Sequence, residues 1–404
     1  MDFGFTEEQE KLRKEVRNFY LDELPEDYSF NTNVFALNEE LQSFWMNLQR
    51  KAAAKGYLTP GWPEEYAGLG LGSVEQGIVD EEEGYAGVRW PSNIGLDLAG
   101  PATILFGTEE QKKKVIPPLA RGEVIWFEAF TEPDAGSDEA NVQLRAIADG
   151  DYYVLNGQKM FITGMYQPDY LYTLVRTKDI IPKHRGLSLF LVPTDTPGIS
   201  FRPLLCMGGY PANEIFFDDV KVPKDALLGE LNRGFYHAMA TFEYERSGMA
   251  FPAGAQAALK EFVQFCKEER RNGKPLIEDP HIREMLAQMA VEVEVYRLVG
   301  WHTQWWFGER ERLGAKPYDL TGYYNKVVAT RHAELKMKIL GLYGQLRLSS
   351  KWAKLDGRIE KSWQAARSLH AAGTLEIYKL VLAQRGLGLP RAPRPVPSKN
   401  EEKQ

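Results

Sequence analysis

The sequence has few cysteines, no excess of positive charge and no long apolar run. Cys206 and Cys266 are too few for a disulfide framework or a four-thiolate metal site, so we expect a reducing, cytoplasmic location. Lys and Arg number 49 against 56 Asp and Glu, a formal charge of −7. Nucleic-acid binding is not expected, because phosphate neutralisation needs a basic surface. The sequence contains no run of about 18 apolar residues, so no membrane span is expected. The acidic N-terminus does not resemble a signal peptide.

Several catalytic signatures are also missing. The six histidines form no HExxH pattern, and the chain has no GxSxG elbow, Walker loop or GxGxxG. His281 and Glu284 are three residues apart, which indicates a solvated pair on one helix face. The aromatic cluster from Trp301 to Phe307 indicates a buried helix face or a subunit contact rather than a cofactor platform. The sequence therefore predicts no metal site.

The 404 residues are too many for one ordinary core and predict two or three domains. Residues 1–123 read mostly as helix, and 124–231 carry strand patterns separated by turns, as in a small antiparallel sheet. Residues 232–389 return to long helices with apolar residues at three- to four-residue spacing, which predicts a bundle. The Pro-rich, charged residues 390–404 predict a disordered tail. The expected fold class is α+β.

Two local signals are specific enough to test. Thr6 followed by Gln9 fits a capping box at the start of the first helix. Asn156-Gly157 lies between two β-rich runs and predicts a type I′ hairpin turn, because both of its central residues must take positive φ. Further strands are expected from Tyr170, Leu187 and Glu214.

The stretch Phe130–Asp138 has the composition of a ligand-binding loop. Gly136 allows a ligand to approach the backbone, while Thr131 and Ser137 supply hydroxyls. The run Phe161-Ile-Thr163-Gly164 ends a predicted strand with an aromatic ring, a hydroxyl and a glycine. From spacing alone, a plain turn and an ordinary strand end explain the same residues.

Taken together, five stretches resemble the acyl-CoA dehydrogenase family in order and spacing. They are Phe130–Asp138, Leu155–Gly164, Glu214–Pro223, Tyr244–Arg246 and Gly373–Ile377. The resemblance implies an N-terminal helical domain, a central antiparallel β domain and a C-terminal four-helix bundle. The closing stretch Gly386–Arg391 resembles the bacterial branch that acts on bulky acyl groups, including steroid side chains.

The resemblance also implies FAD, bound between the β domain and the bundle, and electron-transfer flavoprotein as the electron acceptor. The positions that match cofactor contacts in the family are Phe130, Thr131, Gly136, Ser137, Phe161, Thr163, Thr374 and Glu376. The positions that match the CoA and acyl path are Ser137, Glu243, Arg246, Ala372 and Gly373. Family members of this kind desaturate acyl-CoA thioesters in β-oxidation of fatty acids or steroid side chains.

The catalytic base departs from the commonest family pattern. Desaturation removes a weakly acidic α proton, so the thioester carbonyl must be polarised and a desolvated carboxylate must take the proton. Many members carry this glutamate just before the Gly-Thr pair, where this chain has Ala372. A minority place it directly before the arginine that corresponds to Arg246, and here that residue is Glu245. We therefore assign the base to Glu245; the alternative is an ordinary pair of helix-surface charges.

A second departure concerns the contacts between subunits. Family members that form homotetramers offer an arginine and a phenylalanine before a Gly-x-Pro turn to the neighbouring FAD, whereas this chain has Glu269–Pro275 without a phenylalanine. The expected glycine pair appears only within Leu340–Gly344. A homotetramer or dimer is expected, and a heterotetramer with a paralogue is the alternative, in which this chain has an incomplete FAD site. An acyl-CoA oxidase is a further alternative, while the retained glutamate argues against a redox-neutral desulfinase.

Overall fold

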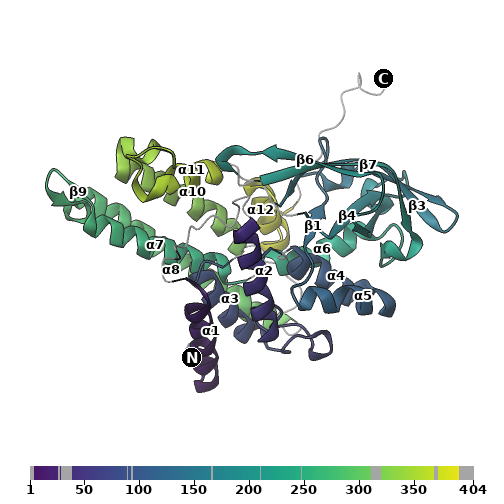
Figure 1. Ribbon diagram of the computed structural model, residues 1–404, viewed down its shortest axis with the longest axis horizontal. Helices are drawn as coiled ribbons and strands as arrows, with labels where there is room; N and C mark the ends of the chain where they lie inside the picture. Colours follow the sequence, from purple (N-terminus) through teal and green to yellow (C-terminus); the bar gives the residue numbers. More distant parts are fainter. Residues whose placement is uncertain are drawn as a thin grey trace.

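The computed structural model describes residues 4–25, 28, 39–88, 90–91, 94–164, 167–209, 211–246, 248–310, 320–367 and 372–390. A group of helices, a sheet and a second group of helices follow one another along the chain, and the sheet lies at one end of the molecule (Figure 1). The predicted disordered tail lies outside the described residues, except for Pro390. Within the described part of the chain, no helix is long and apolar enough to cross a membrane.

The N-terminal helices begin where the sequence predicts. Thr6 caps the first helix, and both bonds of the capping box are present, from the Gln9 amide to Thr6 Oγ1 (3.2 Å) and from the Thr6 amide to Gln9 Oε1 (2.9 Å). This prediction is confirmed. The helices of this segment are α1 Glu7–Glu23, α2 Glu39–Ala54, α3 Ser73–Tyr85, α4 Gly100–Phe106 and α5 Glu109–Ala120, with short turns η1 Glu64–Tyr66 and η2 Gly95–Ala99.

The middle of the chain forms an eight-stranded sheet in the order β6-β7-β3-β2-β4-β5-β8, with β1 paired in parallel to β4. The neighbours β2–β3, β3–β7, β6–β7, β4–β5 and β5–β8 are antiparallel. The strands are β1 Trp126–Ala129, β2 Arg145–Asp149, β3 Tyr152–Thr163, β4 Tyr170–Arg176, β5 Leu187–Pro193, β6 Ile199–Leu205, β7 Pro211–Pro223 and β8 Leu227–Leu228. The three strands expected from Tyr170, Leu187 and Glu214 are present.

The predicted hairpin turn at Asn156-Gly157 is wrong. Both residues lie inside the continuous strand β3, and the chain reverses instead at Gly150-Asp151, between β2 and β3. The pair marks a register shift against β7, where the Asn156 amide donates to Asp219 Oδ1 (3.0 Å) and Asn156 Oδ1 accepts from the Asp219 amide (2.9 Å). The extra residue of this bulge lies on β7, because Asp218 and Asp219 both face Asn156 between the pairs Leu155–Val220 and Gly157–Phe217. Asp219 has a φ of 48°.

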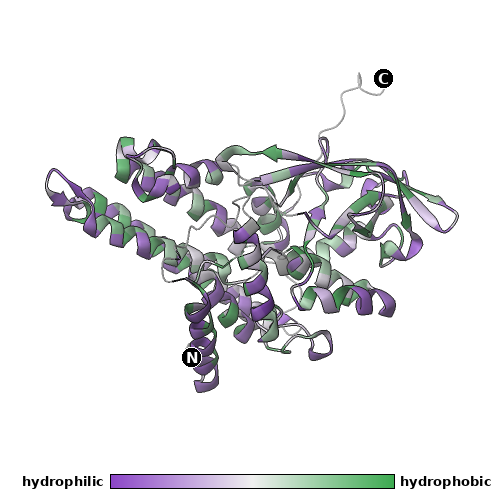
Figure 2. Cartoon of the chain, viewed as in Figure 1, coloured by the Kyte–Doolittle hydropathy of each residue, from purple (hydrophilic) through white to green (hydrophobic). Residues whose placement is uncertain are grey.

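Two of the C-terminal helices, α7 and α8, extend away from the sheet toward a two-stranded hairpin, whereas α6 and α12 lie beside the sheet (Figure 1). The elements are α6 Gly234–Arg246, α7 Ala250–Glu268, β9 Arg270–Arg271, β10 Lys274–Pro275, α8 Pro280–Gly308, α10 Leu320–Leu340, α11 Arg358–Arg367 and α12 Leu375–Val381. Asn272 and Gly273 both have positive φ at the turn of this hairpin, which is largely hydrophilic (Figure 2). His281 and Glu284 are exposed, as expected for a solvated pair.

The aromatic cluster on α8 has a divided environment. Trp306 is buried, whereas Trp305 has 46% of its surface exposed. Trp301 donates from Nε1 to Glu81 Oε1 on α3 (3.1 Å), and Arg297 Nε lies 2.6 Å from the same oxygen. Arg13 of α1 reaches the other oxygen of this carboxylate at 2.6 Å. This network joins α1, α3 and α8. It therefore fixes the N-terminal helices in position relative to the C-terminal helices.

Candidate active site

The loop from Phe130 to Asp138 meets the end of β3. Thr131 O accepts from the Met160 amide (2.9 Å), which joins the start of the loop to the strand. Gly136 and Ser137 are exposed, and a Cβ added at Gly136 would meet no atom within 4 Å. The structure therefore brings the predicted loop residues next to the predicted strand-end residues, with the loop open to solvent.

Phe161 has an unusual position for an aromatic residue. Its side chain is 55% exposed, and its backbone takes a φ of 58°. A positive φ is unfavourable for a bulky side chain and occurs more often at ligand sites than elsewhere. Thr163, two residues later, is half-buried. An exposed ring held in this conformation beside an open loop is a suitable surface for a planar ligand.

Phe130 differs from the rest of the loop because its side chain is only 2% exposed. Its ring lies 5.2 Å from that of Tyr172 on β4 and 6.0 Å from that of Phe242 on α6. The side chain thus connects the loop to α6.

Helix α6 carries the predicted base in its last turn. The backbone of Glu243, Glu245 and Arg246 is helical, and their side chains lie outside the described residues. Glu245 follows Phe242 by three residues, which is about one helical turn or 5 Å along the axis. The helix end is therefore close to the ring that contacts the loop.

Two polar side chains hold the turn after α6. Asp80 of α3 accepts a hydrogen bond from the Met249 amide, and burial raises the pKa of this carboxyl to about 7 against the opposing effect of that bond. With its amide oriented to satisfy both partners, Gln304 of α8 accepts from the Gly248 amide and donates to the Ser73 carbonyl, each at 3.1 Å. These bonds fix the direction in which the chain leaves α6.

The start of α12 supplies the second group of predicted residues. Ala372 and Gly373 have φ values of 55° and 94°, and Thr374 then caps the helix by accepting from the Ile377 amide (3.3 Å). The Tyr378 hydroxyl donates to the Ala372 carbonyl (2.9 Å). Glu376, in the first turn, is exposed. The buried Tyr378 therefore holds in place the two residues with positive φ that precede α12.

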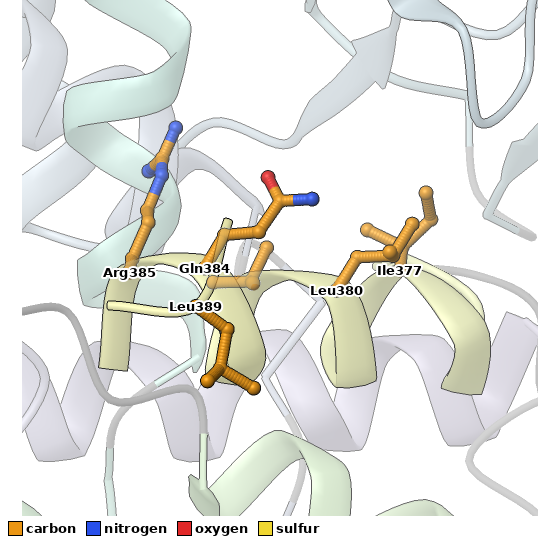
Figure 3. A pocket seen from close by; sticks show the side chains of 6 residues that line it. Ile377, Leu380, Gln384, Arg385 and Leu389 are labelled. Atoms are coloured by element: carbon orange, nitrogen blue, oxygen red, sulfur yellow. The ribbon is translucent and has the colours of Figure 1, made fainter. Parts of the chain in front are cut away.

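A pocket of about 270 Å³ lies along the same helix. Its lining is mostly aliphatic, with one amide and one guanidinium: Ile377, Leu380, Val381, Gln384, Arg385 and Leu389. In Figure 3, Ile377 and Gln384 point to the same side of the helix, and Arg385 extends from its far end. Its first lining residue, Ile377, follows Thr374 by three residues and Glu376 by one, so the pocket lies along the helix that Thr374 caps.

Sequence reasoning gave no separate role to Lys159, Glu132 or Tyr378. Lys159 is fully buried in β3, on the same side as Leu155, at a position where a strand pattern calls for an apolar residue. A charged residue at an inward position of a strand was the available signal, because buried charges need partners. Tyr378 gave no such signal, since its hydroxyl contact depends on the tertiary structure.

No group of three or more His, Cys, Asp or Glu side chains in the described part of the chain could hold a metal ion. The exposed Phe161 ring and the open loop fit a flat heterocycle.

Three family models match the chain in series: the acyl-CoA dehydrogenase N-terminal domain over residues 6–123, the middle domain over 128–220 and the C-terminal domain over 232–387. Acyl-CoA dehydrogenase FadE26 of Mycobacterium tuberculosis is 31% identical, over 98% of this chain and 100% of the relative. The structure of the ChsE4-ChsE5 complex from the same organism matches with a TM-score of 0.85 at 30% identity. The match covers 97% of this chain and 100% of the matched chain. The Tcur3481-Tcur3483 steroid ACAD has a TM-score of 0.83 at 29% identity, with coverage of 97% and 100%. The predicted fold is confirmed, and the chain belongs to the acyl-CoA dehydrogenase family, whose members are FAD-dependent oxidoreductases acting on CH–CH bonds of acyl-CoA.

Proposed function

We propose that this chain introduces a double bond between the α and β carbons of an acyl-CoA thioester, with FAD held where the 130–138 loop meets the end of β3. The observation that carries the proposal is the junction of three elements. The open loop, the exposed Phe161 ring and the last turn of α6 are joined through the Thr131–Met160 bond and the Phe130–Phe242 ring contact. The family match supplies the reaction class.

The residues present fit this cofactor. Phe161 and Thr163 offer a ring and a hydroxyl at the strand end, and Thr131 and Ser137 offer hydroxyls on the loop. Thr374 and Glu376 add polar groups at the start of α12. FAD, when bound, supplies the acceptor for the hydride that leaves the β carbon.

The chain itself handles the proton and the thioester. Glu245 takes the α proton on its carboxylate, and the Ala372 amide donates a hydrogen bond to the thioester carbonyl oxygen, where negative charge develops. The Tyr378 hydroxyl holds the Ala372 carbonyl and so orients this stretch of backbone. Ser137, Glu243, Arg246 and Gly373 lie along the path of CoA, with Arg246 as the positive partner for its phosphates.

The proposed substrate is an acyl-CoA with a bulky or steroid-derived acyl group. Ala371 and Ala372 directly precede Gly373, which leaves room where many family members carry a glutamate. The likeness to the Tcur3481-Tcur3483 steroid ACAD supports this class. We further propose electron-transfer flavoprotein as the acceptor and a cytoplasmic role in degradation of fatty acids or steroid side chains.

A second candidate is a subunit of a heterotetramer that shares its FAD sites with a paralogue. In the β9–β10 stretch, Arg271 donates from Nη2 to Ile339 O (2.6 Å), and Arg270 donates from Nη1 to Gly273 O (3.0 Å). Both guanidinium groups thus bond within this chain, and a partner would have to supply the missing contacts. The likeness to the ChsE4-ChsE5 complex favours this arrangement.

The first test is the visible spectrum, FAD content and native mass of the purified chain. About one FAD per chain in a homotetramer supports the leading proposal, and an acyl-CoA panel assayed with electron-transfer flavoprotein then defines the substrate. A colourless chain that takes up no added FAD contradicts it and favours the heterotetramer. Oxygen consumption without another acceptor identifies an oxidase.

Gly136→Ala is expected to weaken FAD binding by about tenfold without loss of stability. The added methyl group meets no atom of the chain within 4 Å, so the folded protein accommodates it. A cofactor that approaches the loop backbone would contact this methyl group. FAD affinity of the apoprotein and its melting temperature measure the two effects. Unchanged affinity would show that the cofactor does not approach Gly136, and Asp134→Ala, on the same exposed loop, controls for a general loss of charge or order.

A further inference from the structure

The ammonium group of Lys159 lies at the point where β1 leaves the sheet. β1 and β4 pair from Trp126 and Tyr170 as far as Ala129 and Thr173. The next two carbonyls, of Phe130 and Leu174, both accept from Lys159 Nζ, at 2.9 and 2.7 Å. The side chain therefore donates to the two carbonyl groups that the diverging strands leave without an amide donor, where the chain turns into the 130–138 loop.

The third donor of the same ammonium goes to Glu132 Oε1, at 2.8 Å. Glu132 in turn accepts from two backbone amides beyond the loop, those of Leu144 (2.9 Å, at Oε1) and Gln143 (2.5 Å, at Oε2). Both ends of the loop thus connect to one buried ion pair. The exposed residues between these ends include Gly136 and Ser137, which the proposed function assigns to FAD.

A buried ion pair adds little to the stability of a fold, because removing two charges from water costs free energy. Lys159 is fully buried and Glu132 is 5% exposed. Burial lowers the pKa of Lys159 to about 8, although the carboxylates of Glu132, Glu139 and Glu128 oppose the shift. Apolar side chains of similar volume often stabilise a protein as well or better, whereas a charged pair selects one geometry. The pair is therefore suited to holding the loop in one defined position.

We propose that Lys159 is a positioning residue of the FAD site, which sets the loop bearing Thr131 and Ser137 against the strand end bearing Phe161 and Thr163. Lys159 precedes Phe161 by two residues on β3, and the adjacent Met160 amide donates to Thr131 O (2.9 Å). One side chain thereby fixes both predicted walls of the cofactor site. The inference rests on the proposed function for the identity of the ligand, and on the hydrogen bonds of Lys159 and Glu132 for the position of the loop.

The test compares Lys159→Met with the double variant Lys159→Met/Glu132→Gln, which removes both charges and keeps the side-chain sizes similar. The single variant leaves a carboxylate buried without its partner and is expected to melt at a lower temperature. The double variant is expected to recover most of that loss. In both variants, amide exchange over residues 130–144 should be about tenfold faster, and the apoprotein should bind FAD about tenfold more weakly with an altered visible spectrum.

A purely structural role makes a different prediction. The double variant would then recover loop protection, FAD affinity and spectrum together with its melting temperature, and this result overturns the proposal. Lys221→Met/Asp149→Asn removes an exposed lysine–carboxylate pair (3.7 Å) from the same sheet and serves as the matched control. If both Lys159 variants fail to fold, Glu132→Gln alone keeps the shape, and parent-like exchange and affinity in it overturn the proposal. A parent chain that binds no FAD refutes the proposed function, while the exchange measurement still decides the loop position.

Discussion

Glu245→Gln is expected to lower kcat by about 10²–10⁴-fold while the protein stays folded and keeps its FAD. Glutamine has nearly the same shape as glutamate but cannot take up the α proton, so the loss should appear in turnover rather than in cofactor content. A steady-state assay with the best acyl-CoA and an artificial electron acceptor measures kcat and KM. A matching loss of α-proton exchange with solvent deuterium would assign the defect to proton removal.

Glu268→Gln provides the control for this substitution. Glu268 is the exposed last residue of α7, where the same change removes one helix-surface carboxylate. Its kcat should equal that of the parent chain. Parent-like turnover in Glu245→Gln would refute the assignment of the base. It would favour the alternative that Glu245 and Arg246 are ordinary helix-surface charges.

Local signals in the sequence predicted helices and strands where the deciding interactions are local. The capping box at Thr6 and Gln9 satisfies two amides of the first turn by side chains only three residues apart, so no distant contact is needed to find it. The β-rich runs from Tyr170 and Leu187 likewise predict two neighbouring strands, which pair along their whole length.

The Asn156-Gly157 error shows where local signals stop. The same dipeptide forms a tight turn at Asn272-Gly273, where both residues take positive φ, but at Asn156-Gly157 it lies inside the continuous strand β3. The difference lies in Asp219 of β7, whose amide and carboxylate bond the Asn156 side chain from 63 positions away. A turn propensity worth a fraction of a kcal/mol does not compete with a full strand ladder on both sides.

The candidate site was predictable as a set of residues and not as a geometry. The family-like stretches identified the loop and the strand end, but Lys159, which bonds the carbonyls of Phe130 and Leu174, emerged only from the fold. The same holds for Tyr378, whose hydroxyl reaches back six residues to Ala372 around the start of α12. Such residues act by bonding to groups in other segments of the chain, and a sequence pattern does not predict those contacts.

Gly164→Ala should reduce both the stability of the fold and the FAD affinity. A Cβ at this position would lie 1.8 Å from Cζ of Phe127, far inside van der Waals contact. Phe127 is buried on β1 within the core of the sheet, so its ring has little room to move. The backbone is also held on the other side, because Asn213 donates from Nδ2 to Gly164 O (3.0 Å). We expect a loss of about 3 kcal/mol in the free energy of unfolding, measured by urea denaturation.

The position of the clash couples this loss to the site. Gly164 follows Thr163 directly, and the strand end that carries Phe161 must shift if the Phe127 ring does not. Gly164→Ala/Phe127→Leu makes room for the new methyl group by shortening the side chain that it meets, and should recover part of the stability and part of the FAD affinity. Recovery of neither would show that the backbone conformation at Gly164, with its φ of 155°, rather than the Phe127 ring, excludes a side chain here. Full stability in Gly164→Ala alone would mean that the strand end moves freely, and the proposal that it forms a fixed wall of the cofactor site would then fail.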